Sequence, residues 1–122
     1  MFDGIFGHAK EINPQELEKE ISPVLIDGEK IERAFKIVRD LILFTNKRLI
    51  LIDKQGATGS KVEYHSIPYE KITHFSVETA GTFDRDAEFK VWVSGGHTIQ
   101  KEFKKGTDIV GVQKTLAHYV LK

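Results

Sequence analysis

Histidine and aspartate are the residues of this chain that could bind a metal ion. The sequence has five histidines: His8, His65, His74, His97 and His118. No two of them stand four residues apart on an expected helix or two residues apart on an expected strand, the spacings that bring two ligands together. Asp84 and Asp86 form a short D-x-D pair, but the twelve-residue calcium-loop pattern is absent. We therefore expect no metal site.

Motifs for catalysis are also missing. The sequence has no G-x-S-x-G turn for a nucleophilic serine, no Gly-rich phosphate loop and no cysteine. The segment Gly56-Ala57-Thr58-Gly59 is not followed by Gly-Lys-Ser or Gly-Lys-Thr, so it reads as an ordinary loop. We predict that the protein is not an enzyme and needs no cofactor. The alternative is an enzyme or small-ligand carrier, which would require a deep pocket with convergent polar groups.

Four basic residues are the candidate contacts for a lipid headgroup or another anion: Lys36, Arg39, Lys47 and Arg48. To hold a membrane surface they would have to converge on one face beside Phe2 and Phe6. The other interpretation is that all four are solvated charges at strand edges. The chain has 18 Lys and Arg against 18 Asp and Glu. Because this balance lacks the basic excess of a nucleic-acid-binding domain, we expect no nucleic-acid partner.

Two short apolar runs are the strongest signal for an interaction. Leu41–Phe44 and Leu49–Ile52 are apolar on both faces of their expected strands, whereas a solvated antiparallel sheet alternates. Something must therefore cover the outer face of this hairpin. The cover is either the N-terminal segment or a second subunit, and the second possibility makes Ile42 and Phe44 candidate interface residues.

Three aromatic residues are further candidates for an interface. The core side of one expected strand is occupied by Phe89, Val91 and Val93, so Trp92 is expected to point outward. An outward tryptophan either anchors an interface or lies flat over its own sheet against the stem of a lysine or arginine. Phe2 and Phe6 belong to a small apolar cluster at the N-terminus that could pack internally, meet a neighbour or touch a membrane.

The elements that must position these residues are mostly strands. Asn13, Pro14 and Glu16 predict a capped helix over residues 14–21. Thr107 or Asp108 is expected to cap a second, amphipathic helix near the C-terminus. Between them, alternating or apolar runs predict about seven antiparallel strands. Asn46 is expected to take a positive φ in the turn that joins two of them. We divide the chain into an N-terminal helical segment, 1–27, and a domain, 28–122.

Length and composition suit one globular domain. The chain has 122 residues, of which 40% are hydrophobic and 30% charged. No apolar run approaches the roughly 18 residues that span a bilayer, and the first residues do not form a signal peptide. We expect a cytoplasmic protein.

Three motifs resemble those of the bacterial pleckstrin-homology (PH) domain family, within the wider PH-like and GRAM-like superfamily. They are the hairpin Asp40–Ile50, which contains TNKRL, the segment Ser66–Ile72, which contains IPYEKI, and the segment Glu78–Asp84. The resemblance implies a mainly β fold (α+β), a PH-like barrel closed by a C-terminal helix and preceded by a short N-terminal helix. It also implies association into ring-shaped homo-oligomers. PH domains that grip phosphoinositides use a long first loop, but Val38-Arg39-Asp40 is too short for one.

These observations give one functional expectation and one alternative. We expect a non-catalytic interaction scaffold that self-associates, as a ring, and binds another protein through exposed strand edges and outward apolar residues. The alternative is a peripheral membrane or lipid-headgroup binding module.

Overall fold

The computed structural model describes residues 8–79 and 86–121. Phe2 and Phe6 lie outside these residues. Eight strands are described: β1 (His8–Ile12), β2 (Ile31–Ile37), β3 (Asp40–Thr45), β4 (Arg48–Gln55), β5 (Lys61–Pro68), β6 (Ile72–Thr79), β7 (Ala87–Val93) and β8 (His97–Phe103). Short helical turns are η1 (Pro14–Leu17), α2 (Glu18–Ile21), η2 (Ser22–Val24) and η3 (Tyr69–Lys71), and the longer helix is α3 (Ile109–Val120).

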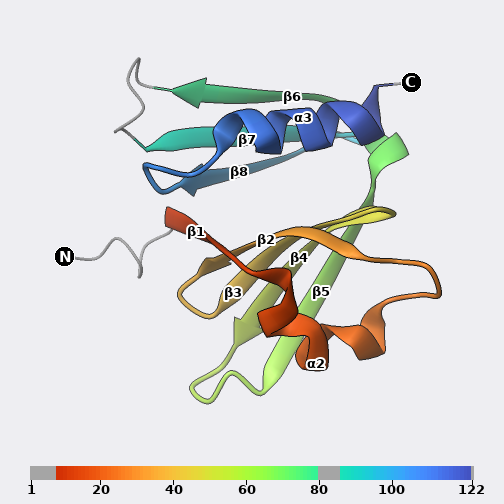
Figure 1. Ribbon diagram of the computed structural model, residues 1–122, viewed down its shortest axis with the longest axis vertical. Helices are drawn as coiled ribbons and strands as arrows, with labels where there is room; N and C mark the ends of the chain where they lie inside the picture. The colour runs from red at the N-terminus through yellow and green to blue at the C-terminus, as the bar shows by residue number, and fades with distance from the viewer. Residues whose placement is uncertain (1–7, 80–85, 122) are drawn as a thin grey trace.

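The strands follow one continuous order, β5-β4-β3-β2-β1-β8-β7-β6, and form two layers (Figure 1). The predicted mainly β, PH-like fold with two terminal helical regions is confirmed. The strand count differs from the expected seven because β1 was not predicted. β1 runs antiparallel to β2 but parallel to β8, where His8 pairs with Glu102 and Ala9 with Phe103. Its sequence, HAKEI, carries little strand preference, so the pairing with two distant strands decides its conformation.

Both helix starts use the residues that the sequence indicated. The Asn13 side chain accepts a hydrogen bond from the Gln15 amide at 2.9 Å, at the start of η1. The Asp108 side chain accepts from the Gly111 amide at 3.0 Å and caps α3. Each side chain satisfies an amide that the first helical turn leaves without a partner.

The main core lies between the two layers. It is closed by α3, which contributes Val112 and Leu116, both 0% exposed. Phe103 stacks on Phe35 and Phe89, with ring centroids 4.7 and 5.3 Å away. These buried rings supply a large share of the apolar area that stabilises the barrel.

A second core covers the outer face of β2, β3 and β4. Leu17 and Ile21 from the N-terminal helical turns pack against Leu41, Leu43 and Ile50. The internal cover that the sequence left open is therefore present, at the bottom of Figure 1. Ile42 and Phe44 point the other way, into the main core, and are 2% and 0% exposed. Their proposed role at an interface is wrong, because neither side chain reaches the surface.

The turn between β3 and β4 also differs from expectation. Asn46 does not take the positive φ expected there. The non-glycine residue with a positive φ in the described chain is Val38, at 55°, in the turn between β2 and β3. Asn46 instead holds the segment before β2. Its Oδ1 accepts from the Lys30 amide at 2.7 Å, and its Nδ2 donates to the Gly28 carbonyl at 2.9 Å.

Candidate functional site

The outer face of β6, β7 and β8 differs from the rest of the sheet because no described element packs on it. Phe89 and Val91 point into the core, so Glu88, Lys90 and Trp92 point outward. The register places His74 and Thr98 on either side of Trp92. Most of the neighbours on β6 and β8 that share this face are exposed. We call this surface the outer β6–β8 face.

Trp92 points outward, as the sequence predicts, and lies flat on its own sheet. Its ring stacks on His74, with centroids 4.3 Å apart and an angle of 18° between the planes. The Lys90 ammonium lies 5.5 Å from the centre of the Trp92 ring, within the range of a cation–π contact. The indole therefore forms a rigid, partly exposed platform. Its role at an interface stays a prediction.

Two long strands have one free edge each. In the described chain β5 pairs with β4 and β6 pairs with β7, and each stands at one end of the strand order. β5 is exposed along most of its length, with Ile67 as its buried residue. Free edges of this kind can accept a strand from another chain.

Two of the predicted basic contacts, Lys36 and Arg39, lie near the start of β3, and Lys47 lies beyond its end. Lys36 is exposed on β2. Arg39 lies in the turn before β3 and Lys47 in the turn after it, so the six residues of that strand separate them. The predicted basic residues do not all converge on one face, because the two turns are at opposite ends of β3.

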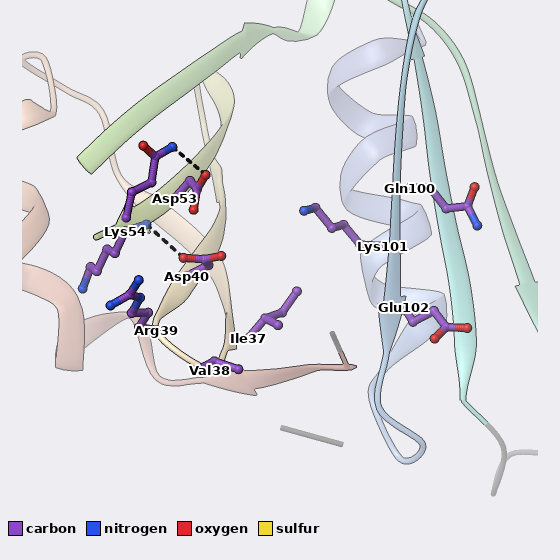
Figure 2. A pocket seen from close by; sticks show the side chains of 10 residues that line it. Ile37, Val38, Arg39, Asp40, Asp53, Lys54, Gln100, Lys101 and Glu102 are labelled. Atoms are coloured by element: carbon purple, nitrogen blue, oxygen red, sulfur yellow. Dashed lines mark hydrogen bonds between the residues drawn. The ribbon is translucent and has the colours of Figure 1, made fainter. Parts of the chain in front are cut away.

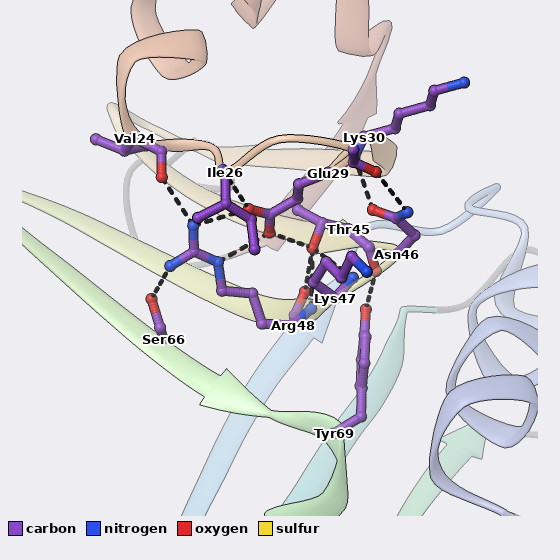
Figure 3. A network of polar contacts seen from close by, with 11 residues as sticks. Val24, Ile26, Glu29, Lys30, Thr45, Asn46, Lys47, Arg48, Ser66 and Tyr69 are labelled. Atoms are coloured by element: carbon purple, nitrogen blue, oxygen red, sulfur yellow. Dashed lines mark hydrogen bonds and ion pairs between the residues drawn. The ribbon is translucent and has the colours of Figure 1, made fainter.

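Arg48 is not a solvated strand-edge charge. Its Nε donates to Glu29 Oε2 at 2.8 Å, and its Nη2 donates to Glu29 Oε1 at 2.9 Å and to the Val24 carbonyl at 2.8 Å (Figure 3). Nη1 donates to Ser66 Oγ at 2.9 Å. The interpretation of Arg48 as an open basic contact is wrong, since the guanidinium ties the N-terminal segment to β4 and β5. Glu29 carries no sequence signal that would have revealed this role.

Glu29 is the buried half of this ion pair, with a side chain 0% exposed. Burial alone would raise the pKa of its carboxyl group. Hydrogen bonds from Arg48, Thr45 and the Ile26 amide outweigh burial and lower the pKa to about 2. The carboxylate therefore stays charged at neutral pH, and its contacts hold the segment before β2 against the β3–β4 hairpin.

A cleft of about 820 Å³ opens between β8 and the β2–β3 turn (Figure 2). Lys101 points into it from β8, whereas Gln100 and Glu102 point away. Arg39, Asp40 and Asp53 lie on the opposite wall. The Lys101 ammonium and the Arg39 guanidinium make no ion pair with another described residue. The sequence did not indicate Lys101, because nothing in its spacing shows that β8 faces the turn.

Within 8–79 and 86–121 no group of three or more histidine and acidic side chains is placed to hold a metal ion. No helix in those ranges is long and apolar enough to cross a membrane.

Comparison with known proteins gives the family. The chain is similar to "Uncharacterized protein YjqA" of Bacillus subtilis (strain 168), 53% identical over 117 residues that cover 94% of each chain. "Uncharacterized protein YozO" of the same organism is 34% identical over 117 residues, 96% of this chain and 97% of that one. A solved DUF1696 family protein with a pleckstrin-homology domain, from Shewanella loihica PV-4, is 59% identical with a TM-score of 0.83, covering 94% of this chain and 99% of that one. The family model described as "Bacterial PH domain" matches residues 1–120. This chain therefore belongs to the bacterial PH domain family.

Proposed function

We propose that this bacterial PH domain is a non-catalytic scaffold that self-associates into a ring and binds other proteins. PH domains are typically non-catalytic. The cytoplasm is the proposed site of action, consistent with a sequence that has no cysteine.

The uncovered outer β6–β8 face is the observation that supports this proposal. The outer face of the other layer is covered by the N-terminal helical turns, which bury Leu17 and Ile21. The outer β6–β8 face has no such cover and presents Trp92 on a rigid stack with His74. Tryptophan on a rigid, partly exposed surface is the type of residue that contributes most to protein–protein binding.

The free edges of β5 and β6 support the second part of the proposal, the binding of other proteins. An extended segment of a partner can add to either edge through backbone hydrogen bonds. Such pairing needs little from the side chains, so it suits an edge such as β5, whose side chains are mostly exposed.

The solution mass tests this function. Light scattering across a concentration series should give a stable multimer well above the 13.9 kDa of one chain. Trp92→Ala should weaken that assembly while leaving the monomer folded. Val110→Ala, which shortens a side chain 56% exposed on α3, is the matched control and should assemble like the original chain. A monomer at every concentration would contradict the proposed self-association.

A second candidate function is the binding of an anionic group in the cleft. Lys101, which points into this cleft, and Arg39, which lines it, favour this function because neither has an ion-pair partner among the described residues. Co-sedimentation with anionic and neutral vesicles tests a lipid headgroup, and calorimetry with inorganic phosphate tests a free anion. Lys101→Met should abolish either binding. No binding in either experiment at low salt would remove this candidate.

A further inference from the structure

We propose that the self-association is head to tail and is directed by two charged pairs of opposite sign, Glu78 with Glu88 on one copy and Lys10 with Lys36 on the next. This inference rests on the proposed self-association and names the surfaces that meet.

The acidic pair lies on the outer β6–β8 face. Glu78 on β6 stands directly opposite Glu88 on β7, and the row continues to Glu102 on β8. Gln100 donates a hydrogen bond to Glu88, but this contact brings no positive charge. Lys90, the nearest lysine on that face by register, approaches the Trp92 ring instead. In the described chain neither Glu78 nor Glu88 makes an ion pair.

The basic pair lies on the outward side of β1 and β2. Lys10 stands directly opposite Lys36 in the antiparallel ladder, and both are exposed. The acidic residues around them are occupied elsewhere: Glu11 pairs with Arg33 at 2.8 Å, and Glu32 accepts a hydrogen bond from Tyr119. Neither ammonium has an ion-pair partner among residues 8–79 and 86–121.

Each pair alone is unfavourable. Like charges directly opposite on neighbouring strands repel, because their Cβ atoms are only about 5 Å apart. The two pairs do not neutralise each other within one chain: β8 lies between β7 and β1, and no ion pair joins the four described residues.

Contact between two copies removes both repulsions. The charges of each pair have the same spacing, that of two neighbouring strands, so two carboxylates can face two ammonium groups. The chain has no net charge, so copies do not repel one another at long range. If each copy turns its acidic pair toward one neighbour and its basic pair toward another, the contact is heterologous, and it closes into a ring where the rotation allows.

Two double charge reversals test this contact. In one variant Lys10→Glu is combined with Lys36→Glu, and in the other Glu78→Lys is combined with Glu88→Lys. Each reversal keeps a like-charge pair within the monomer, so thermal unfolding should match that of the original chain. Each variant alone should self-associate at least about 100-fold more weakly, because like charges now meet across the contact. An equimolar mixture of the two variants should recover the original mass, since each then meets opposite charges.

The control reverses two lysines elsewhere, Lys47→Glu with Lys114→Glu, and changes the net charge by the same amount as the first variant. It should assemble like the original chain. If both double variants also assemble normally, or if the mixture stays monomeric, the charged pairs are not the contact, although self-association itself stands. If the original chain is a monomer at every concentration, the proposed function and this inference both fail.

Discussion

The barrel has two outer faces, that of β2–β4 and the outer β6–β8 face, and the N-terminal segment covers only the first. The covered face is apolar, and the N-terminal helical turns bury it. The Glu29–Arg48 ion pair holds the segment that follows these turns. The bare face carries an aromatic stack and a row of carboxylates. The first arrangement stabilises the monomer. The second contributes little to the monomer and leaves a surface for contact.

The largest effect is expected on the covered face, from the loss of Arg48. Arg48→Met should lower the free energy of unfolding by about 3–5 kcal/mol, because it leaves the Glu29 carboxylate buried without its partner. Urea unfolding measures the change. Arg48→Lys keeps the charge but not the paired hydrogen bonds, and should cost less. A loss below about 1 kcal/mol for Arg48→Met would mean that water replaces the guanidinium at no great cost.

The apolar part of the same cover should also carry much of the stability. Ile21→Ala removes a side chain that is 0% exposed between the helical turns and the sheet. We expect a loss of about 3 kcal/mol in urea unfolding, typical of a large-to-small change in a core. Ile26→Ala, at a side chain 60% exposed in the same segment, is the control and should change stability by less than about 0.5 kcal/mol. Equal losses would show that the cover is loosely attached.

Acid should weaken the covered face selectively. The pKa of Glu29 falls from 4.5 to about 2 on folding, so its charged form stabilises the protein fully above about pH 5. That contribution, at most about 3 kcal/mol, should disappear as the pH falls from 5 to 2. Urea unfolding at pH 7, 5 and 3 follows the loss. Glu29→Gln should remove this part of the pH dependence, and an unchanged slope would assign it to other carboxyl groups.

The smallest effect on stability is expected on the bare face. Trp92→Ala should lower the free energy of unfolding of the monomer by less than about 1 kcal/mol, because it removes one surface stack and no core contact. Unfolding is measured at low protein concentration, so that assembly does not contribute. A loss as large as that of Ile21→Ala would show that the outer β6–β8 face stabilises the monomer as much as the covered face does.

Local patterns predicted the parts of the fold that depend on neighbouring residues. Alternating and apolar runs along the chain indicated β2 to β8, and Asn13 and the pair Thr107 or Asp108 marked the two helix starts, where Asn13 and Asp108 are the caps. The same patterns failed where distant segments decide. β1 forms because β2 and β8 flank it, and Asn46 bonds to the backbone of residues 28 and 30 rather than adopting a positive φ.

The candidate site residues also fall into two groups, those that a local pattern placed correctly and those that depend on distant segments. Trp92 was found from the period of one strand, since its neighbours fix which side it faces. Ile42 and Phe44 were misplaced because an apolar run does not show which of its two faces another segment will cover. The Glu78–Glu88 and Lys10–Lys36 pairs were not visible at all, because they depend on strand register.

The sequence by itself thus determined the family, the positions of most strands along the chain and the outward direction of Trp92. All three follow from short-range periodicity and motifs. Only the tertiary structure decided that Arg48 is buried against Glu29, that the N-terminal segment covers one sheet face, and that like charges stand opposite one another. The physical reason is that burial and cross-strand pairing join residues far apart in the chain, and their spacing along the sequence carries no record of that contact.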